Sequence, residues 1–395
     1  MTTDARPGIA LRLTAITAAA AALLAVVSGV QASAGMHRVL AALALPPLVA
    51  IAVAVYAHRR LLVPVAVALC SFLGAAAVTS HALHVLFAAI ALASTCVLAV
   101  ACFRGTALAC GTVRDYLTLT KPRIMSLLLV TGACGMVVGA RGWPGTARFA
   151  LTLIGLALAC GGASALNHLL DRDIDRLMGS RTSDRPVATG RLAPSRALEF
   201  GLALSACSFT LLASTVNVLT AVLALVGNLF YVVVYTGYLK RRGPENIVLG
   251  GVAGAVPPLV GYAAATGSVA VPALWLFAIV CLWTPPHFWA LAILLREHYA
   301  RAEVPMLPVV RGESVTLRRI VAYTVVLVVA TVIPVATGTF GALYLVAALL
   351  LGGLFLALSV RLLRAPSRKG AAGLFHYSLL YLALLFVAAA LDPLL

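Results

Sequence analysis

Long uninterrupted runs of apolar residues are the feature that most constrains the fold of this chain. A helix needs about 17 to 25 such residues to cross a bilayer, and about thirteen runs in the 395 residues meet that length. Only a helix satisfies its own backbone hydrogen bonds within one such segment. The sequence therefore predicts an all-α polytopic membrane protein. The expected spans are residues 14–35, 39–57, 61–79, 85–103, 124–140, 149–170, 197–213, 216–238, 247–265, 272–295, 319–337, 341–363 and 374–391.

The net charge of +17 is explained by membrane topology, so we expect no nucleic-acid partner. If residue 1 is cytoplasmic, every Lys and Arg except Arg38, Arg141 and Arg148 lies on the cytoplasmic side, as the positive-inside rule requires. Eleven of the twelve acidic residues lie on or near the same side, which that rule does not require. We therefore expect a cell (inner) membrane protein whose N-terminus and active-site loops are cytoplasmic.

A polar connection near residues 104–118 divides the apolar chain. It predicts two membrane domains, with four helices in residues 1–110 and nine in residues 111–395. The eight cysteines include no CxxC pair and lie in or beside apolar runs, so we interpret them as small buried apolar residues.

The stretch NHLLDRDIDRLMGSRTSDRP, residues 167–186, gathers eight charged side chains in a chain that is 10% charged. Asn167, Asp171 and Asp175 follow one another at i, i+4 and i+8, so they share one face of a helix. Few hard oxygen ligands suit Mg²⁺ that keeps its waters and also binds a substrate phosphate, and the neighbouring arginines would bind phosphate oxygens. The alternative is a solvated loop of alternating charges.

The pattern N-x₃-D-x₃-D followed by R-T-x₂-R-P resembles the first signature of the UbiA-type intramembrane prenyltransferases. Three further stretches, TKPRI (120–124), YTGYLKRRGPENIVLGGVAGAVPPLVGY (235–262) and WTPPHFWALAILLREHYARAEVPMLPVVRG (283–312), resemble the protohaem IX farnesyltransferase, or haem O synthase, family. The resemblance covers residues 115–391. It implies a nine-helix bundle that transfers farnesyl from farnesyl diphosphate to a vinyl group of haem b with addition of water, giving haem O.

The resemblance also implies roles for individual residues. Mg²⁺ would be held by Asn167, Asp171 and Asp175, which with Lys240 and Arg241 form the expected catalytic group. The diphosphate would be bound by Lys121, Arg123, Arg181, Arg185, Arg242 and Tyr235. Haem b would contact His287, Trp283 and Glu297, with His287 either ligating the iron or bonding a propionate. Gly250, Gly251, Gly254, Pro257 and Pro258 fit either a cleft for the prenyl tail or simple helix packing.

The chain departs from this family pattern at His298, where Asp is usual, and at Gly243, where Thr is usual. The loss of that Asp leaves open whether one or two Mg²⁺ ions bind. Prenyl chain length, haem orientation and oligomeric state also stay open.

The first four expected spans precede the usual prenyltransferase. Their stretches GMHRVLAAL (35–43) and SHALHVLFAAIALA (80–93) are similar to one half of the haem A synthase family. That similarity implies that His37 and His84 ligate an additional haem b, and it suggests haem A synthase as a partner. The alternative is that these histidines belong to a structural or assembly domain.

Two other functions are consistent with parts of the sequence. The acidic stretch would look the same in a UbiA-type prenyltransferase acting on a quinone precursor or another ring acceptor. Proline-interrupted helices and intramembrane histidines also occur in transporters and in non-enzymatic haem-binding membrane proteins. Membrane lipid is a partner in every case.

Overall fold

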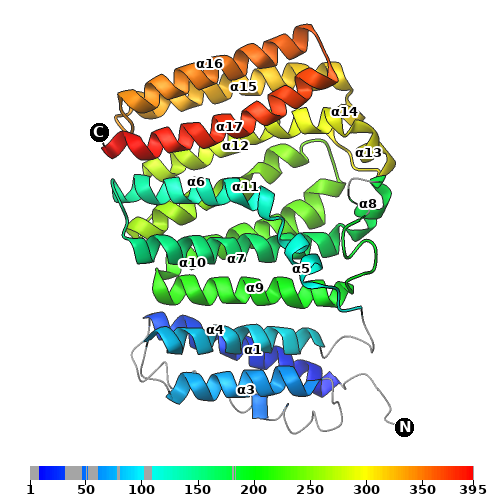
Figure 1. Ribbon diagram of the computed structural model, residues 1–395, viewed down its shortest axis with the longest axis vertical. Helices are drawn as coiled ribbons and strands as arrows, with labels where there is room; N and C mark the ends of the chain where they lie inside the picture. Colours follow the sequence, from blue (N-terminus) through cyan, green and yellow to red (C-terminus); the bar gives the residue numbers. More distant parts are fainter. Residues whose placement is uncertain are drawn as a thin grey trace. The chain divides into compact units, whose positions relative to one another are not determined.

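The computed structural model describes residues 9–31, 47–49, 51, 61–77, 81–101, 109–179, 182 and 184–394 (Figure 1). Within that part of the chain all regular secondary structure is helical, and ten helices are long and apolar enough to cross a membrane. The prediction of an all-α polytopic membrane protein is therefore confirmed. The ten segments are His84–Ala101, Pro122–Ala140, Thr146–Leu170, Pro194–Thr215, Val218–Arg241, Asn246–Thr266, Val271–Leu294, Glu313–Ala336, Ala342–Arg364 and Arg368–Leu394.

The nine segments after residue 111 match the nine spans expected there. The expected span 85–103 also forms, as helix α4 (His81–Ala101). Spans 14–35 and 61–79 appear as α1 (Ile9–Gln31) and α3 (Leu62–Ala77), whose most apolar stretches are shorter. Span 39–57 lies largely outside the described residues.

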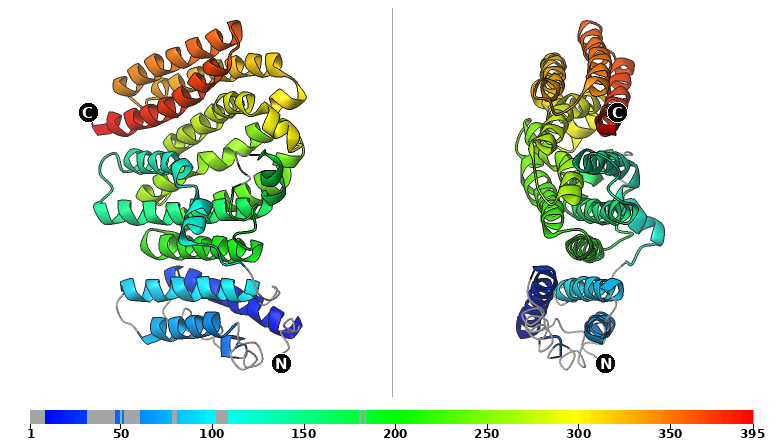
Figure 2. Two further views of the ribbon diagram at one scale, coloured as in Figure 1. Left: turned by 45° about the vertical axis from the view of Figure 1, so that its right-hand side comes forward. Right: turned by 90° about the vertical axis from the view of Figure 1, so that its left-hand side faces the viewer.

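The chain forms two compact units, and neither is one continuous segment. The first unit comprises Met1–Lys121, Ala157–Leu169 and Arg185–Leu225. Within it, α4 packs against α1, α3 and α9 (Pro194–Thr215), as Figure 2 shows from two sides. The N-terminal helices thus share a unit with a helix from the predicted second domain. The domain boundary expected at residue 110 stays a prediction.

The second unit comprises Pro122–Leu156, Leu170–Asp184 and Val226–Leu395. Its centre is a ring in which each helix packs against two others: α6 and α12 each contact both α11 and α17. Helices α15 and α16 continue from this ring, with α15 against α12 and α16 against α15 and α17. The bounds are α6 (Pro122–Ala140), α11 (Asn246–Thr266), α12 (Val271–Leu294), α15 (Glu313–Ala336), α16 (Ala342–Arg364) and α17 (Arg368–Leu391).

Small residues let α6 and α11 approach until their backbones touch. A Cβ on Gly261 would overlap the carbonyl of Gly132, and one on Gly135 would overlap the carbonyl of Pro258. Helix packing in membranes favours such contacts because apolar side chains gain little by leaving lipid. Gly254, in contrast, faces open space. Pro258 therefore serves helix packing, and Gly254 stays available for a cleft.

The one acidic residue expected away from the cytoplasmic face has a structural role. Asp392 accepts hydrogen bonds from the backbone N–H groups of Gly341 and Tyr344, the latter at 3.1 Å, at the start of α16. A carboxylate there satisfies donors that the helix leaves unpaired and complements the helix dipole.

Candidate active site

The acidic stretch lies where one helix ends and a short one begins. Helix α7 (Thr146–Leu170) stops just before Asp171, which is the N-cap residue of α8 (Arg172–Leu177). The side chains of Asn167, Asp171 and Asp175 are almost wholly buried, with 2%, 1% and 1% of their surface exposed. Three buried polar groups contradict the alternative of a solvated loop. The expected continuous helix is interrupted at Asp171, although the N–H of Asp175 still donates to the Asp171 carbonyl at 2.8 Å.

In the first unit, a lysine meets the amide of this stretch. Lys121 Nζ donates to Asn167 Oδ1 at 2.6 Å. Lys121 has a φ of 49°, a left-handed conformation that ends helix α5 (Val113–Thr120) before Pro122. Such a turn is sterically costly for lysine, so the surrounding contacts must hold it in place.

Those contacts fix both ends of α5. Thr112 and Asp115 form a reciprocal capping box at its start, and Arg191 pairs with Asp115 at 3.1 Å. The backbone hydrogen bond from Thr112 is the main cause that lowers the pKa of Asp115, with Arg191 contributing. At the other end, Ser164 of α7 donates to the Leu119 carbonyl at 2.6 Å. Lys121 is thereby directed at Asn167.

In the second unit, a lysine meets the first carboxylate. Lys240 Nζ lies 2.6 Å from Asp171 Oδ2, and the two side chains are only 12% and 1% exposed. The pair is desolvated, so its electrostatic attraction is much stronger than between exposed groups.

Arg241 is held by a residue that the sequence analysis did not single out. Its guanidinium makes two hydrogen bonds with Asp173, at 2.6 and 2.8 Å, and a third with the Leu170 carbonyl at 2.8 Å. Asp173 lies between Asp171 and Asp175, and that alternation was the available signal for a carboxylate facing outward.

The hydrogen bonds from Arg241 lower the pKa of Asp173 to about 2. Because the folded-state pKa is lowered, this pair stabilises the fold above about pH 4 and loses that effect as pH falls through 2. Asp173 therefore keeps Arg241 in position at all physiological pH values.

The cations Lys240 and Arg241 follow a local change of helix type. Helix α10 (Val218–Leu229) continues into a π-helical segment, η4 (Phe230–Tyr238), and then a 3₁₀ turn, η5 (Leu239–Arg241). Segments of π-helix are rare and often occur at functional sites, since the wider turn re-aims the side chains that follow. Sequence periodicity alone cannot reveal this change.

The other residues expected to bind diphosphate differ in how deeply they are buried and in what they contact. Tyr235 is half-buried, stacks on Tyr231 with ring centroids 5.6 Å apart, and packs against Gly250. The Arg242 guanidinium lies over the Tyr238 ring at 4.3 Å, near the exposed surface. Arg123 is exposed and Arg185 is half-buried, while Arg181 lies outside the described residues.

Aromatic rings enclose His287 between α12 and α17. The imidazole stacks on Trp283 at a centroid distance of 4.3 Å and on Phe375 at 4.8 Å. Trp283 Nε1 donates to the Ser378 carbonyl at 2.8 Å, which ties the two helices together. Glu297 lies instead in α13 (Arg296–Arg301), where its side chain is 83% exposed and approaches Arg301 at 3.8 Å.

The Ser378 hydroxyl lies between His287 and a backbone carbonyl. Ser378 Oγ is 2.6 Å from both His287 Nδ1 and the Phe375 carbonyl. A hydroxyl has one proton, so when Ser378 donates it to the carbonyl, its oxygen accepts from Nδ1. In that arrangement the neutral ring is protonated on Nδ1, and Nε2 carries the lone pair.

The departure at His298 also has a structural explanation. His298 Nδ1 donates to the Met178 carbonyl at 2.7 Å, so α13 is tied to the end of α8. The imidazole contributes a hydrogen-bond donor at the position where the resemblance led us to expect a carboxylate.

The donor set fits a divalent cation that also binds substrate. Among the described residues, no group of three or more His, Cys, Asp or Glu side chains could hold a metal ion by itself. Asp171 and Asp175 are two buried carboxylates on one short helical segment, and Mg²⁺ is commonly bound by one or two carboxylates plus phosphate oxygens and waters. Such a site would be completed only by a phosphate-bearing ligand.

Replacing Lys240 by Met tests the buried ion pair. Lys240→Met leaves the Asp171 carboxylate buried without its cation, so we expect the free energy of unfolding to fall by about 3 kcal/mol or more. Adding Asp171→Asn should recover most of that loss. Denaturant unfolding in mixed micelles would measure both effects. The exposed Arg242→Met is the control, and an equal loss in that variant would contradict the assignment.

Comparison with known proteins shows which family the sequence belongs to. Residues 128–387 match the UbiA prenyltransferase family. A Symbiobacterium thermophilum protein named Protoheme IX farnesyltransferase is 52% identical over 282 residues, covering 71% of this chain and 94% of that protein. A Thermus thermophilus protein of the same name is 49% identical over 282 residues, covering 71% of this chain. The chain spans about half the length of this second relative, 46%.

Solved structures share the fold at low sequence identity. A structure of digeranylgeranylglyceryl phosphate synthase superposes with a TM-score of 0.60 at 19% identity, covering 71% of this chain and 98% of that one. A UbiA homolog from Archaeoglobus fulgidus bound to DMAPP and Mg²⁺ gives 0.52 at 18%, covering 70% and 99%. With its helical bundle, buried acidic stretch and family match, the chain belongs to the UbiA prenyltransferase family.

Proposed function

We propose that this chain transfers the farnesyl group of farnesyl diphosphate to a vinyl group of haem b, with addition of water, to give haem O. The observation that carries the proposal is the 52% identity across nearly all of a relative named Protoheme IX farnesyltransferase. The stretches at 235–262 and 283–312, which resemble the same family, favour haem over a quinone precursor or another ring acceptor. The same identity to an enzyme disfavours a transporter or a non-enzymatic haem-binding protein.

The cations of the site would bind and stabilise the diphosphate as it leaves. Lys240 and Arg241 already have carboxylate partners at 2.6 Å, so binding exchanges one set of anionic oxygens for another. Tyr235, between Tyr231 and Gly250, would offer a hydroxyl from the same segment. We assign supporting roles in diphosphate binding to Lys121, Arg123, Arg181, Arg185 and Arg242.

Asp171, Asp175 and Asn167 would hold Mg²⁺, with the diphosphate completing its ligands. The ion supplies positive charge next to the leaving group. Lys240 lies 2.6 Å from Asp171 and Lys121 lies 2.6 Å from Asn167 Oδ1, so both ammonium groups are close enough to contact a diphosphate bound at these oxygens.

Loss of diphosphate from the allylic carbon C1 would give a delocalised farnesyl cation. The haem vinyl carbon attacks C1, and water adds to the resulting porphyrin-side cation and releases a proton. No protein nucleophile is needed. The apolar helices exclude other water from the cation, and the open space at Gly254 offers room for the prenyl tail.

His287 is the residue that we assign to the haem. When Nδ1 donates to Ser378, the lone pair on Nε2 suits the iron, while a propionate would require an N–H there. We therefore favour iron ligation over a propionate hydrogen bond. Trp283 would support the ring by stacking, and Glu297 would act only at the exposed rim.

We also propose a second haem b in the first unit, with haem A synthase as a partner. The observation in favour is that His84 Nδ1 donates to the Ala75 carbonyl at 2.8 Å, a bond that orients metal-ligating histidines in many proteins. His37, the expected second ligand, lies outside the described residues. We further propose that the protein resides in the inner membrane with its acidic stretch facing the cytoplasm.

The transferase activity is tested by the haems of cells that lack their own haem O synthase. Expression of this chain should yield haem O, and the double variant Asp171→Asn, Asp175→Asn should yield less than about 1% of that amount because the leaving group loses its counter-charge. Mass spectrometry of extracted haems is the measurement. The control Glu245→Gln, Glu313→Gln removes the same charge outside the site. Haem b alone from the intact chain, with expression confirmed, would refute the proposal.

The role of His287 is tested by the absorbance of haem b bound to purified protein. We expect His287→Ala to lose the Soret absorbance of the haem in the second unit, while the haem that we assign to His84 keeps its own band. Ser378→Ala should weaken haem binding about tenfold, because the imidazole loses the bond that orients it. Ser359→Ala removes a buried hydroxyl from α16 and should have no effect. An unchanged spectrum in His287→Ala would exclude ligation.

The second haem is tested by counting haem per chain. The His287→Ala variant should retain one haem b per chain, and adding His84→Ala should remove it. Pyridine haemochrome assay of purified protein gives the stoichiometry. Equal haem content in both variants would refute haem ligation by His84.

A further inference from the structure

Four unpaired cations gather at the end of the last helical hairpin. Arg361 and Arg364 lie in the last turn of α16, and Arg368 and Lys369 open α17. All four side chains are exposed, and none of them forms a hydrogen bond or ion pair with any described residue. Helices α16 and α17 and their connection contain no Asp or Glu, so this charge has no nearby compensation.

The positive-inside rule accounts for cations at this end of a hairpin, but it requires no particular arrangement. Some cations of the second unit on the same side have carboxylate partners, such as Lys240 with Asp171, and others, such as Arg311 and Arg318, have none among the described residues. The group of four differs from both because the two helices that carry it contain no Asp or Glu at all. Its charge can therefore be compensated by an anion from outside the chain.

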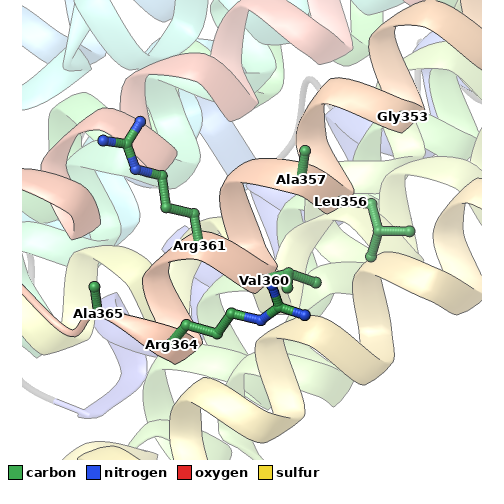
Figure 3. Close-up of a pocket in the computed structure, with 7 residues that line it drawn as sticks. All are labelled: Gly353, Leu356, Ala357, Val360, Arg361, Arg364 and Ala365. Atoms are coloured by element: carbon green, nitrogen blue, oxygen red, sulfur yellow. The ribbon is translucent and has the colours of Figure 1, made fainter.

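A hollow on the surface of α16 ends at two of these cations. It is open, encloses about 530 Å³, and runs along one face of the helix (Figure 3). Gly353 forms its far end, where an added Cβ would meet nothing within 4 Å. Its lining residues are Gly353, Leu356, Ala357, Val360, Arg361, Arg364 and Ala365.

Two of the four cations, Arg361 and Arg364, line the hollow itself, so apolar and cationic groups share one surface. From Gly353 to Val360 the wall is apolar and belongs to a helix long and apolar enough to cross a membrane, where hydrocarbon is the expected solvent. The distance from Gly353 to Arg364 along the axis is about 16 Å at 1.5 Å per residue, enough for the upper part of an acyl chain. The guanidinium groups lie at the headgroup end.

We propose that this surface binds an anionic phospholipid, with one acyl chain in the α16 hollow and its phosphate among Arg361, Arg364, Arg368 and Lys369. Each basic residue near a membrane surface favours anionic lipid, and arginines bind phosphate oxygens with paired hydrogen bonds. Farnesyl diphosphate has a similar shape, but no carboxylate lies in α16 or α17 to hold Mg²⁺ beside it. The proposal is independent of the transferase activity.

Native mass spectrometry of protein exchanged into mixed phosphatidylglycerol and phosphatidylcholine tests this proposal. The intact chain should retain phosphatidylglycerol selectively, and Arg361→Gln, Arg364→Gln should lower that retention about tenfold. Gly353→Leu keeps every charge but fills the hollow, so it should also lower retention. The control Arg311→Gln, Arg318→Gln removes two exposed cations at the start of α15 and should leave retention unchanged.

Three outcomes would overturn the proposal. One is equal retention of both lipids by the intact chain. Another is an equal loss in the control pair, which would indicate nonspecific surface charge. The third is displacement of phosphatidylglycerol by equimolar farnesyl diphosphate without Mg²⁺, which would assign the surface to the substrate.

Discussion

Burying carboxylates beside a membrane requires cations within hydrogen-bonding distance, and the rest of this structure serves that requirement. Asp171 is 1% exposed, and Lys240 at 2.6 Å offsets part of the cost of burying its carboxylate. Lys240 reaches it because α10 widens into a π-helix and then tightens into a 3₁₀ turn. The neighbouring Arg241 is anchored by Asp173, which keeps this turn against α8. In the function that we propose, a charged substrate binds at this centre when Lys240 exchanges the Asp171 carboxylate for the anionic oxygens of the substrate.

The haem-facing group that we propose depends on a different kind of constraint. A ring stacked between Trp283 and Phe375 cannot tilt freely, and its bond to Ser378 prevents free rotation about the side-chain axis. The hydroxyl of Ser378 is in turn committed to Phe375. Two helices thus fix the orientation of the imidazole, which aromatic packing without the Ser378 contact would not do.

Local departures from a family pattern need not be losses. His298 stands where the family resemblance led us to expect a carboxylate, and its imidazole ties α13 to the end of α8. Asp392 also has a structural role, because this one carboxylate expected away from the cytoplasmic face caps the start of α16.

The sequence by itself determined the class of the molecule and pointed to the acidic stretch as its candidate site. Apolar runs predicted all nine spans after residue 111, because crossing a bilayer leaves a chain few options but helices. The spacing of Asn167, Asp171 and Asp175 predicted a cluster of oxygen ligands, and all three are buried. Only the tertiary structure decided which cation meets which oxygen, because Lys121 and Lys240 are 46 and 69 residues away from their partners. It alone showed that Glu297 is exposed, that Asp173 pairs with Arg241 and that Ser378 lies beside His287, since these depend on contacts that no local pattern encodes.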